Sequence, residues 1–290
     1  MDKKYRKMIE KIKVDAEAYT DKEMKPVYEA QKQELDALNV LVGGLYIKYS
    51  MDGLLKMNSS QKANTGIKTT LKNIGKRLGN VETEKVTSIL SDTFKDVYYK
   101  SAYIMDSGIK TELKFGILKK EFIDAAVNAK YKGELFSDRI WKNKGDMIDK
   151  LQSSLTDAMQ GKTTIDKIGR DIKNTFNVTA YESQRLVNTE NSRVQAQASY
   201  DIGVSSGVDQ VMFSATLDNK TNEEDASYDG NIYDINDDSK PEIPLHPNCR
   251  CLYINIPYEG WSPTSRKDNE TKDIIDYTTY DKWKENKNIS

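Results

Sequence analysis

Hydrophobic residues recur at helical spacing through the first third of the chain. From Lys4 to Met105, apolar side chains return every three or four residues, which is typical of helices that bury one face. The pattern predicts four helices, with Pro26 opening the second and Gly79 ending the third, and a polar loop over 58–64. The stripes of the third and fourth helices are Ile67, Leu71, Ile74 and Leu78, then Val86, Ile89, Leu90, Phe94, Val97 and Tyr98. We predict a helical bundle and docking region over 1–133, with these stripes buried inside the chain and not by a partner.

Three more helices are expected between residues 134 and 202. The last of them carries polar groups on one face, which is usually solvated but would also suit a hydrogen-bond network against the next domain. The expected start signals are Ser137, then Thr163 with Asp166, then Thr179 with Glu182, and Gly161 is the expected stop of the first helix. The polar face of the last helix contains Arg185, Thr189, Glu190 and Arg193.

The period changes from helical to alternating after Gly203. Residues 211–217 alternate as a half-buried strand does, and 251–256 alternate as a second strand. Between them, 218–221 has turn composition and 228–231 resembles a hairpin turn. The fold class is therefore α+β: a mainly helical N-terminal half, then helices leading into a small antiparallel β module. We predict three parts, 1–133, a module over 134–257, and a polar, partly disordered C-terminal tail over 258–290.

The amino-acid composition argues against some classes of function. The 44 Lys and Arg residues nearly cancel the 45 Asp and Glu residues, which argues against binding to nucleic acid through net charge. The start has no signal-peptide core, and no apolar run approaches the ~20 residues that span a bilayer. We expect a soluble protein of a reducing cytoplasm with no membrane partner.

The hexapeptide His246-Pro247-Asn248-Cys249-Arg250-Cys251 concentrates the reactive side chains. It holds the only histidine and both cysteines of the chain. In an extended segment the two thiols point to the same side, as two ligands of one metal ion must. Zinc would need a fourth ligand from the acidic stretch that follows residue 217, which offers Asp218, Glu223, Glu224, Asp225 and Asp229.

A structural, metal-free hexapeptide is the favoured interpretation. Zinc sites usually have a second close pair of ligands, and this chain has none. We therefore expect no cofactor, with the thiols packed in a small core and Asn248 in an unusual backbone conformation; zinc bound by His246, Cys249 and Cys251 is the alternative. The acidic run 218–238 is expected to be a solvated loop. Arg250 is expected to bind a carboxylate through two hydrogen bonds, from either Glu190 or Asp218.

Catalytic signals are weak. Residues 203–207 match the G-x-S-x-G string of serine hydrolases, but that motif follows a strand and precedes a helix, and here the order is reversed. The proline between His246 and Cys249 constrains a cysteine–histidine pair. We predict that the protein is not an enzyme, with a metal-dependent enzyme centred on the hexapeptide as the alternative.

One series of residues resembles a known family. It is Asn188-Thr189-Glu190 on a helix, Asp218 and Thr221, Asp229-Gly230, and finally the hexapeptide with Pro247, Asn248 and Arg250. The series is similar to the head-morphogenesis, or minor head, proteins of tailed bacteriophages, including the phage Mu F protein. Two positions depart from the family pattern, Asn188 in place of an arginine and the lack of cysteines after the Asp218–Thr221 turn.

The resemblance implies a low-copy structural protein of the phage head. Its expected partners are the portal protein, the scaffold or major capsid protein, and phage DNA. Its expected location is the interior of the virion head, with host cytoplasm as the place of assembly. We predict a structural role for this series of residues.

Overall fold

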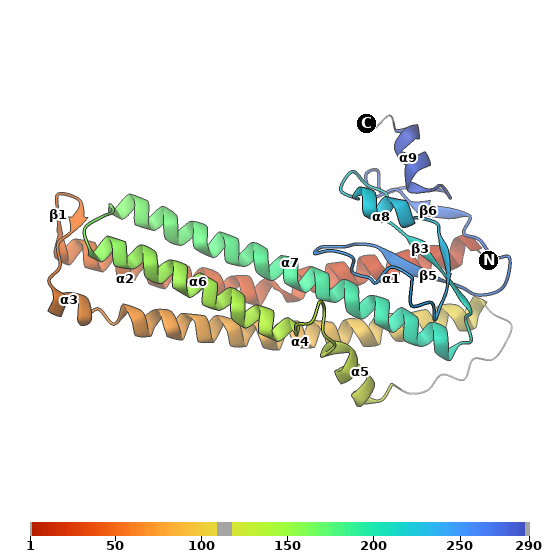
Figure 1. Cartoon of the computed structure of the whole chain (residues 1–290), viewed down its shortest axis with the longest axis horizontal. Coiled ribbons are helices and arrows are strands. Elements are labelled where there is room, and N and C mark those ends of the chain that lie inside the picture. The colour runs from red at the N-terminus through yellow and green to blue at the C-terminus, as the bar shows by residue number, and fades with distance from the viewer. Residues whose placement is uncertain (1, 109–117, 288–290) are drawn as a thin grey trace. The chain divides into compact units, whose positions relative to one another are not determined.

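The structure is a computed structural model that describes residues 2–108 and 118–287 (Figure 1). Its helices are α1 (Asp2–Glu23), α2 (Lys25–Tyr49), α3 (Ser59–Ala63), α4 (Ile67–Gly108), α5 (Lys120–Val127), α6 (Phe136–Met159), α7 (Ile165–Ser205), α8 (Glu223–Tyr228) and α9 (Tyr280–Asn286). Its strands are β1 (Ser50–Met51), β2 (Leu54–Leu55), β3 (Gln210–Ser214), β4 (Ile232–Asp234), β5 (Leu252–Ile256), β6 (Ser265–Lys267) and β7 (Ile274–Asp276). The α+β class and the antiparallel β module are confirmed. No helix of the described ranges has both the length and the apolar character needed to cross a bilayer.

The described chain forms two compact units. One joins residues 22–87 to 130–186, and the other joins 1–21, 88–129 and 187–290. We call them the helical unit and the mixed unit. This division differs from the predicted parts 1–133, 134–257 and 258–290, because each unit draws on segments that are far apart in the sequence. The three-part division stays a prediction.

The helical unit contains α2, α3, α6 and parts of α4 and α7, which lie alongside one another (Figure 1). Its core is formed by residues of α2, by the stripe predicted for the third helix, and by residues of α6 and α7. The stripe predicted for the fourth helix is buried as well, so intramolecular burial of both stripes is confirmed. The buried members are Leu38, Val42, Tyr46, Leu55, Met57, Ile67, Leu71, Ile74, Leu78, Met147, Leu151, Leu155, Ala158, Ile168, Ile172 and Phe176.

Helix α4 corrects the prediction of two separate helices. The helix runs through Gly79, where an added Cβ would lie 2.4 Å from the ring of Trp141, so this glycine permits close packing against α6. The apolar stripe is also interrupted at Glu82, which is fully buried and paired with Lys144 of α6. The glycine and the polar residue that follows it both favoured the prediction of two helices where there is one.

Helix α7 corrects the sequence prediction in the same way. The expected short helix and the helix expected to start at Thr179 are one helix of 41 residues. Thr179 is 2% exposed and its hydroxyl donates to the carbonyl of Thr175, so it bonds within the helix and caps nothing. The stripe continues through Thr179, Ser183 and Glu190, all of them buried polar residues. The other predicted starts are shifted: α6 begins at Phe136, with Leu135 at the cap position, and α7 at Ile165. The stop at Gly161 is confirmed by its φ of +76°.

The predicted loop over 58–64 contains the short helix α3. Asn58 caps it: its side chain accepts from the backbone N–H of Gln61, and the Gln61 side chain accepts from the N–H of Asn58. This reciprocal pair satisfies two N–H groups at the start of the helix.

The mixed unit contains a three-stranded antiparallel sheet in the order β4-β3-β5. Val211 of β3 lies opposite Tyr233 of β4 and Asn255 of β5. The predicted strand over 211–217 is shorter than expected, since β3 ends at Ser214. Both of its faces are buried, because Met212 and Ser214 are covered as well as Val211 and Phe213.

The C-terminal segment 258–287 is folded, which corrects the predicted polar, partly disordered tail. It contains β6, β7 and α9, and its residues Trp261, Arg266, Asp268 and Trp283 are buried. Tyr277 donates a hydrogen bond to the sulfur of Met212, so the segment covers the face of β3 that the alternating pattern assigned to solvent. Residues 288–290 of the predicted tail lie outside the described residues.

Candidate functional site

The hexapeptide 246–251 lies in the mixed unit between α7 and the sheet. Asn248 has a φ of +62°, so the expected unusual conformation is confirmed. Its backbone N–H donates to the hydroxyl of Thr189 at 3.1 Å, and the hydroxyl of Ser192 donates to the carbonyl of Cys249 at 2.8 Å. On the other side, Thr216 donates to the carbonyl of Arg250 at 2.8 Å. The motif therefore joins α7 to the segment that follows β3.

Arg250 binds Asp218, one of its two predicted partners. Its guanidinium donates to both carboxylate oxygens; the Nη2–Oδ1 distance is 2.9 Å. Asp218 also accepts from the N–H of Lys220 and from the Thr221 hydroxyl, which closes the turn predicted over 218–221. Burial raises the pKa of Asp218, but the hydrogen bonds and charge of Arg250 outweigh burial and hold that pKa below its ordinary value.

Glu190 has a different partner from the one predicted. It lies 2.7 Å from the guanidinium of Arg193, one turn along α7. Arg193 also donates to the carbonyls of Ala126 and Val127 at 2.7 and 3.1 Å, and so binds the C-terminal end of α5. Thr189, Glu190 and Arg193 are only 2, 0 and 7% exposed, so the prediction that this helix face is solvated is wrong for them. They belong instead to a hydrogen-bond network, the alternative that the sequence left open.

The acidic stretch is also less solvated than predicted. Its first half forms α8, and Asp218, Asp225 and Asp229 are 5, 4 and 9% exposed. Asp229 accepts hydrogen bonds from the N–H groups of Ala215 and Tyr280, and Gly230 follows it with a φ of +85°. Glycine is suited to this left-handed conformation, which turns the chain from α8 into β4.

The three predicted metal ligands have different surroundings. Cys249 and Cys251 are buried among Phe213, Ala215 and Ile243, as the packing interpretation requires. His246 is 31% exposed in its side chain, and its Nε2 lies 2.9 Å from a carboxylate oxygen of Asp225. Burial lowers the pKa of His246, but hydrogen bonds to the Pro247 carbonyl and to Asp225 raise it overall.

Of these two buried cysteines, Cys249 is the more easily deprotonated. A hydrogen bond from the Cys251 thiol, with further ones from backbone groups of Cys251 and Leu245, lowers the pKa of Cys249 to about 6. The same contact and burial raise the pKa of Cys251. A carboxylate oxygen of Asp225 lies within 4.8 Å of both sulfur atoms. The residues that could hold a soft metal are thus Asp225, Cys249 and Cys251, with His246 attached to Asp225.

Two residues of this site carry no signal in the sequence. Lys13 of α1 donates to the carbonyl of Arg250 and lies 3.3 Å from the Thr216 hydroxyl. Arg266 of β6 binds Asp229 through both of its terminal nitrogens, at 2.7 and 3.0 Å. Lys13 comes from near the start of the chain and Arg266 from the segment that follows β5, and neither stands in a recognisable motif.

Comparisons with known proteins find relatives that match this part of the chain. Residues 149–254 match the family of phage Mu protein F-like proteins, a range that includes Thr189, Asp218 and the hexapeptide. The minor head protein GP7 of Bacillus phage SPP1 is 23% identical over 310 aligned positions, which cover 98% of this chain and 96% of that protein. The chain is therefore similar to phage minor head proteins along nearly its whole length.

A second relative of the chain carries the name of an enzyme. NAD(+)–arginine ADP-ribosyltransferase EFV of Enterococcus faecalis (strain ATCC 700802 / V583) is 26% identical over 205 residues, which cover 64% of this chain. The chain spans only 41% of that protein, so more than half of the transferase lies outside the match. No solved structure matches the chain.

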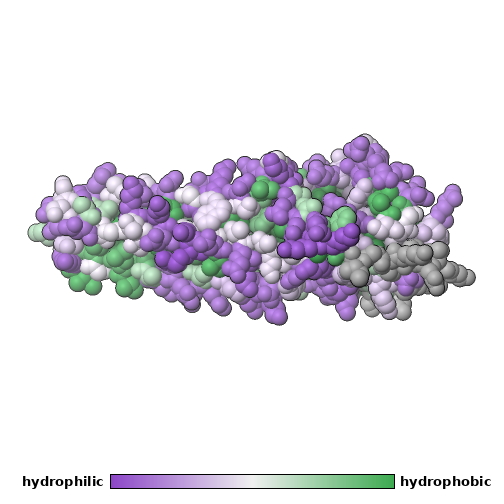
Figure 2. All heavy atoms as spheres, turned by 90° about the horizontal axis from the view of Figure 1, so that it is seen from below, coloured by the Kyte–Doolittle hydropathy of each residue, from purple (hydrophilic) through white to green (hydrophobic). Residues whose placement is uncertain are grey.

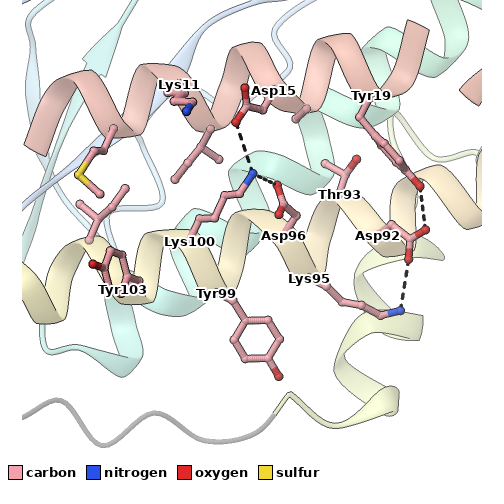
Figure 3. A pocket seen from close by; sticks show the side chains of 14 residues that line it. Lys11, Asp15, Tyr19, Asp92, Thr93, Lys95, Asp96, Tyr99, Lys100 and Tyr103 are labelled. Atoms are coloured by element: carbon pink, nitrogen blue, oxygen red, sulfur yellow. Dashed lines mark hydrogen bonds and ion pairs between the residues drawn. The ribbon is translucent and has the colours of Figure 1, made fainter. Parts of the chain in front are cut away.

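A further hollow lies elsewhere in the mixed unit. It is a groove of about 950 Å³ lined by α1 and the C-terminal part of α4 (Figure 3). Lys100 lies in it between Asp15, at 3.5 Å, and Asp96, at 2.7 Å, while Asp92 accepts from Tyr19. These charges neutralise one another within the groove, and no predicted site residue lines it.

Loss of Arg250 tests the contact between the hexapeptide and the turn over 218–221. Arg250→Ala leaves Asp218, which is 7% exposed in its side chain, without its charge partner. Because Arg250 itself is one third exposed, we expect a loss of about 2 kcal/mol in unfolding free energy at neutral pH, less than for a fully buried pair. Denaturant unfolding of both proteins measures it.

The pH dependence of this loss has a defined sign. A carboxyl group with a lowered folded pKa stabilises the fold above its unfolded pKa of about 3.9, and the contribution disappears as pH falls through the folded value. The difference between wild type and Arg250→Ala should therefore be complete at pH 7 and narrow below about pH 4. A difference that stays constant with pH would contradict the ion pair as its source.

Proposed function

We propose that this protein is a phage minor head protein that acts in procapsid assembly, in contact with the portal and with the scaffold or major capsid protein, inside the head. The observation that carries the proposal is the end-to-end match with a minor head protein, over 98% of this chain and 96% of that one. We propose a structural role and not an enzymatic one.

The character of the predicted site supports a structural role. The carboxylates and thiols around the hexapeptide are bound to neighbouring elements or buried, and an enzyme with a metal centre needs an open coordination position that substrate can reach. Asp225, Cys249 and Cys251 are 4, 2 and 4% exposed. This geometry favours a rigid module over the alternative of a metal-dependent enzyme.

The helical unit offers side chains suited to contact with a partner. On α2, Val40 and Ile47 are 77 and 90% exposed, and Met51 of β1 is 59% exposed. Figure 2 shows one face of the molecule, on which hydrophilic residues predominate and hydrophobic residues form separate patches. We propose that the helical unit docks on another head protein and that phage DNA is a further contact during packaging or delivery.

Quantitative mass spectrometry of purified particles tests the proposed function. We expect the protein in procapsids and in mature virions, in low amount relative to the major capsid protein. Crosslinking within procapsids should join it to the portal or scaffold. The lysate supernatant is the matched control, and a protein confined to the supernatant and missing from every particle would refute the proposal.

A further inference from the structure

The two thiols of the hexapeptide share their buried surroundings with one carboxylate. One ligand atom each from Asp225, Cys249 and Cys251 lies within 4.8 Å of the other two. Asp225 comes from α8, and the cysteines come from the end of the loop that leads into β5. The fold therefore brings together a ligand set that the sequence divides by more than twenty residues.

The carboxylate of Asp225 is only partly satisfied by protein groups. Its Oδ2 lies 2.9 Å from His246 Nε2, whereas its Oδ1 is buried and has no hydrogen-bond partner within the described ranges. Burying an unbonded carboxylate oxygen is costly, and native proteins rarely leave one without a partner. Packing of the thiols as small apolar groups does not account for this oxygen. A cation bound between the oxygen and the two sulfur atoms accounts for it.

The chemistry of the three groups selects the kind of ion. Magnesium and calcium prefer oxygen ligands alone, whereas zinc binds cysteine thiolates together with carboxylates or imidazoles. Two sulfur ligands and one oxygen ligand therefore fit a borderline-soft divalent ion.

We propose that Asp225, Cys249 and Cys251 bind one zinc ion, and that His246 positions Asp225 through its hydrogen bond. Binding releases the thiol protons to solvent, since the thiolates are the ligands. The ion connects α8 to the hexapeptide, and because its ligands are buried its role is structural. The proposal does not depend on the role in head assembly, and it reverses the preference for metal-free thiols that the sequence alone supports.

Metal analysis of the full chain is the direct test. The protein is purified without chelator, and its zinc is measured by inductively coupled plasma mass spectrometry after desalting. We expect one zinc per chain. Replacement by cobalt should give the thiolate-to-cobalt charge-transfer band in the near ultraviolet. A wild-type protein that holds no zinc after incubation with zinc sulfate and desalting would overturn the proposal, and so would bound cobalt without the charge-transfer band.

Variants of the ligands assign the site. Asp225→Asn keeps the size of the side chain and removes its charge, and Cys249→Ser removes one thiolate; both should lose stoichiometric zinc. Glu224→Gln is the matched control, because it removes one charge from the exposed neighbouring position of α8, and it should keep one zinc. His246→Ala should bind zinc on the order of tenfold more weakly, as loss of a group that orients a ligand does.

Thermal melting with and without a chelator separates binding from folding. Chelator should lower the melting temperature of wild type and of Glu224→Gln, and leave Asp225→Asn unchanged. If Cys249→Ser does not fold, the zinc content of Asp225→Asn and the cobalt spectrum of wild type still test whether the site binds zinc. Equal zinc content in Asp225→Asn and wild type would overturn the proposal.

Discussion

Replacing Arg266 by alanine should destabilise the protein by about 3–5 kcal/mol, because it leaves a buried carboxylate without its charge partner. The side chains of Arg266 and Asp229 are 2 and 1% exposed. The guanidinium also donates to the carbonyls of Ala215 and Thr278, and Asp229 accepts from the N–H of Tyr280. One ion pair thus holds together the end of β3, the end of α8, β6 and the start of α9. Removing it should loosen the whole C-terminal segment.

Denaturant unfolding and limited proteolysis measure this effect. Arg170→Ala removes an exposed arginine from α7 and is the matched control, with an expected change within about 0.5 kcal/mol. In wild type the segment 258–287 should resist protease as well as the β3 strand does, and in Arg266→Ala it should be cleaved early. Equal protection in the two proteins would show that the ion pair does not hold the segment. A fragment ending at Pro257 should be less stable than the full chain for the same reason.

Replacing Lys144 by methionine should cost a similar amount, about 3–5 kcal/mol, in the helical unit. Lys144 and Glu82 are 2 and 0% exposed in their side chains, and their charged atoms lie 2.5 Å apart. Ser183 donates to Glu82 at 2.9 Å and accepts from Gln31 at 3.1 Å, so the pair is the centre of a small buried network. Lys144→Met leaves the Glu82 carboxylate inside the core without a cation.

A double variant distinguishes the cost of an unpaired charge from loss of packing. Glu82→Met combined with Lys144→Met removes both charges and should recover most of the loss, because buried ion pairs contribute little beyond their own desolvation. Lys150→Met, at an exposed position of α6, is the matched control and should leave the unfolding free energy nearly unchanged. If the double variant is as unstable as Lys144→Met, the loss comes from packing and not from the charge.

The same buried polar residues explain where the sequence prediction failed. Apolar spacing predicts a helix only while the buried positions are apolar. Glu82 in α4, and Thr179 and Ser183 in α7, occupy buried positions and have polar side chains. Each is satisfied by a hydrogen bond or an ion pair from another turn or another helix, so the helix continues where its pattern breaks. Local sequence does not reveal those partners.

The C-terminal segment was mispredicted for a related reason. Its sequence is polar and lacks apolar periodicity, which is typical of disorder. Its order depends on a few residues with distant partners, above all Arg266 with Asp229, and Trp283 with Asp268, whose contact is 2.9 Å long. Hydrogen bonds of this kind, and not an apolar stripe, hold the segment in its folded conformation. They cannot be predicted from amino-acid composition.

The sequence alone predicted the local structure of the hexapeptide better than it predicted the extent of the helices. The short spacing of His246, Cys249 and Cys251, the left-handed Asn248 and the need of Arg250 for a carboxylate follow from local chemistry, since covalent neighbours are fixed in distance. The α+β class follows from the change of hydrophobic period after Gly203. Both can be read from residues that are close together in the chain.

Only the tertiary structure decided which distant groups meet. It chose Asp218 over Glu190 for Arg250, brought Asp225 to the thiols, and placed the C-terminal segment on β3. Several carboxylates stand in the acidic stretch with similar local surroundings, so sequence offers no basis for choosing among them. Burial makes that choice, because a carboxylate removed from water is stable only where a specific cation or hydrogen-bond donor reaches it.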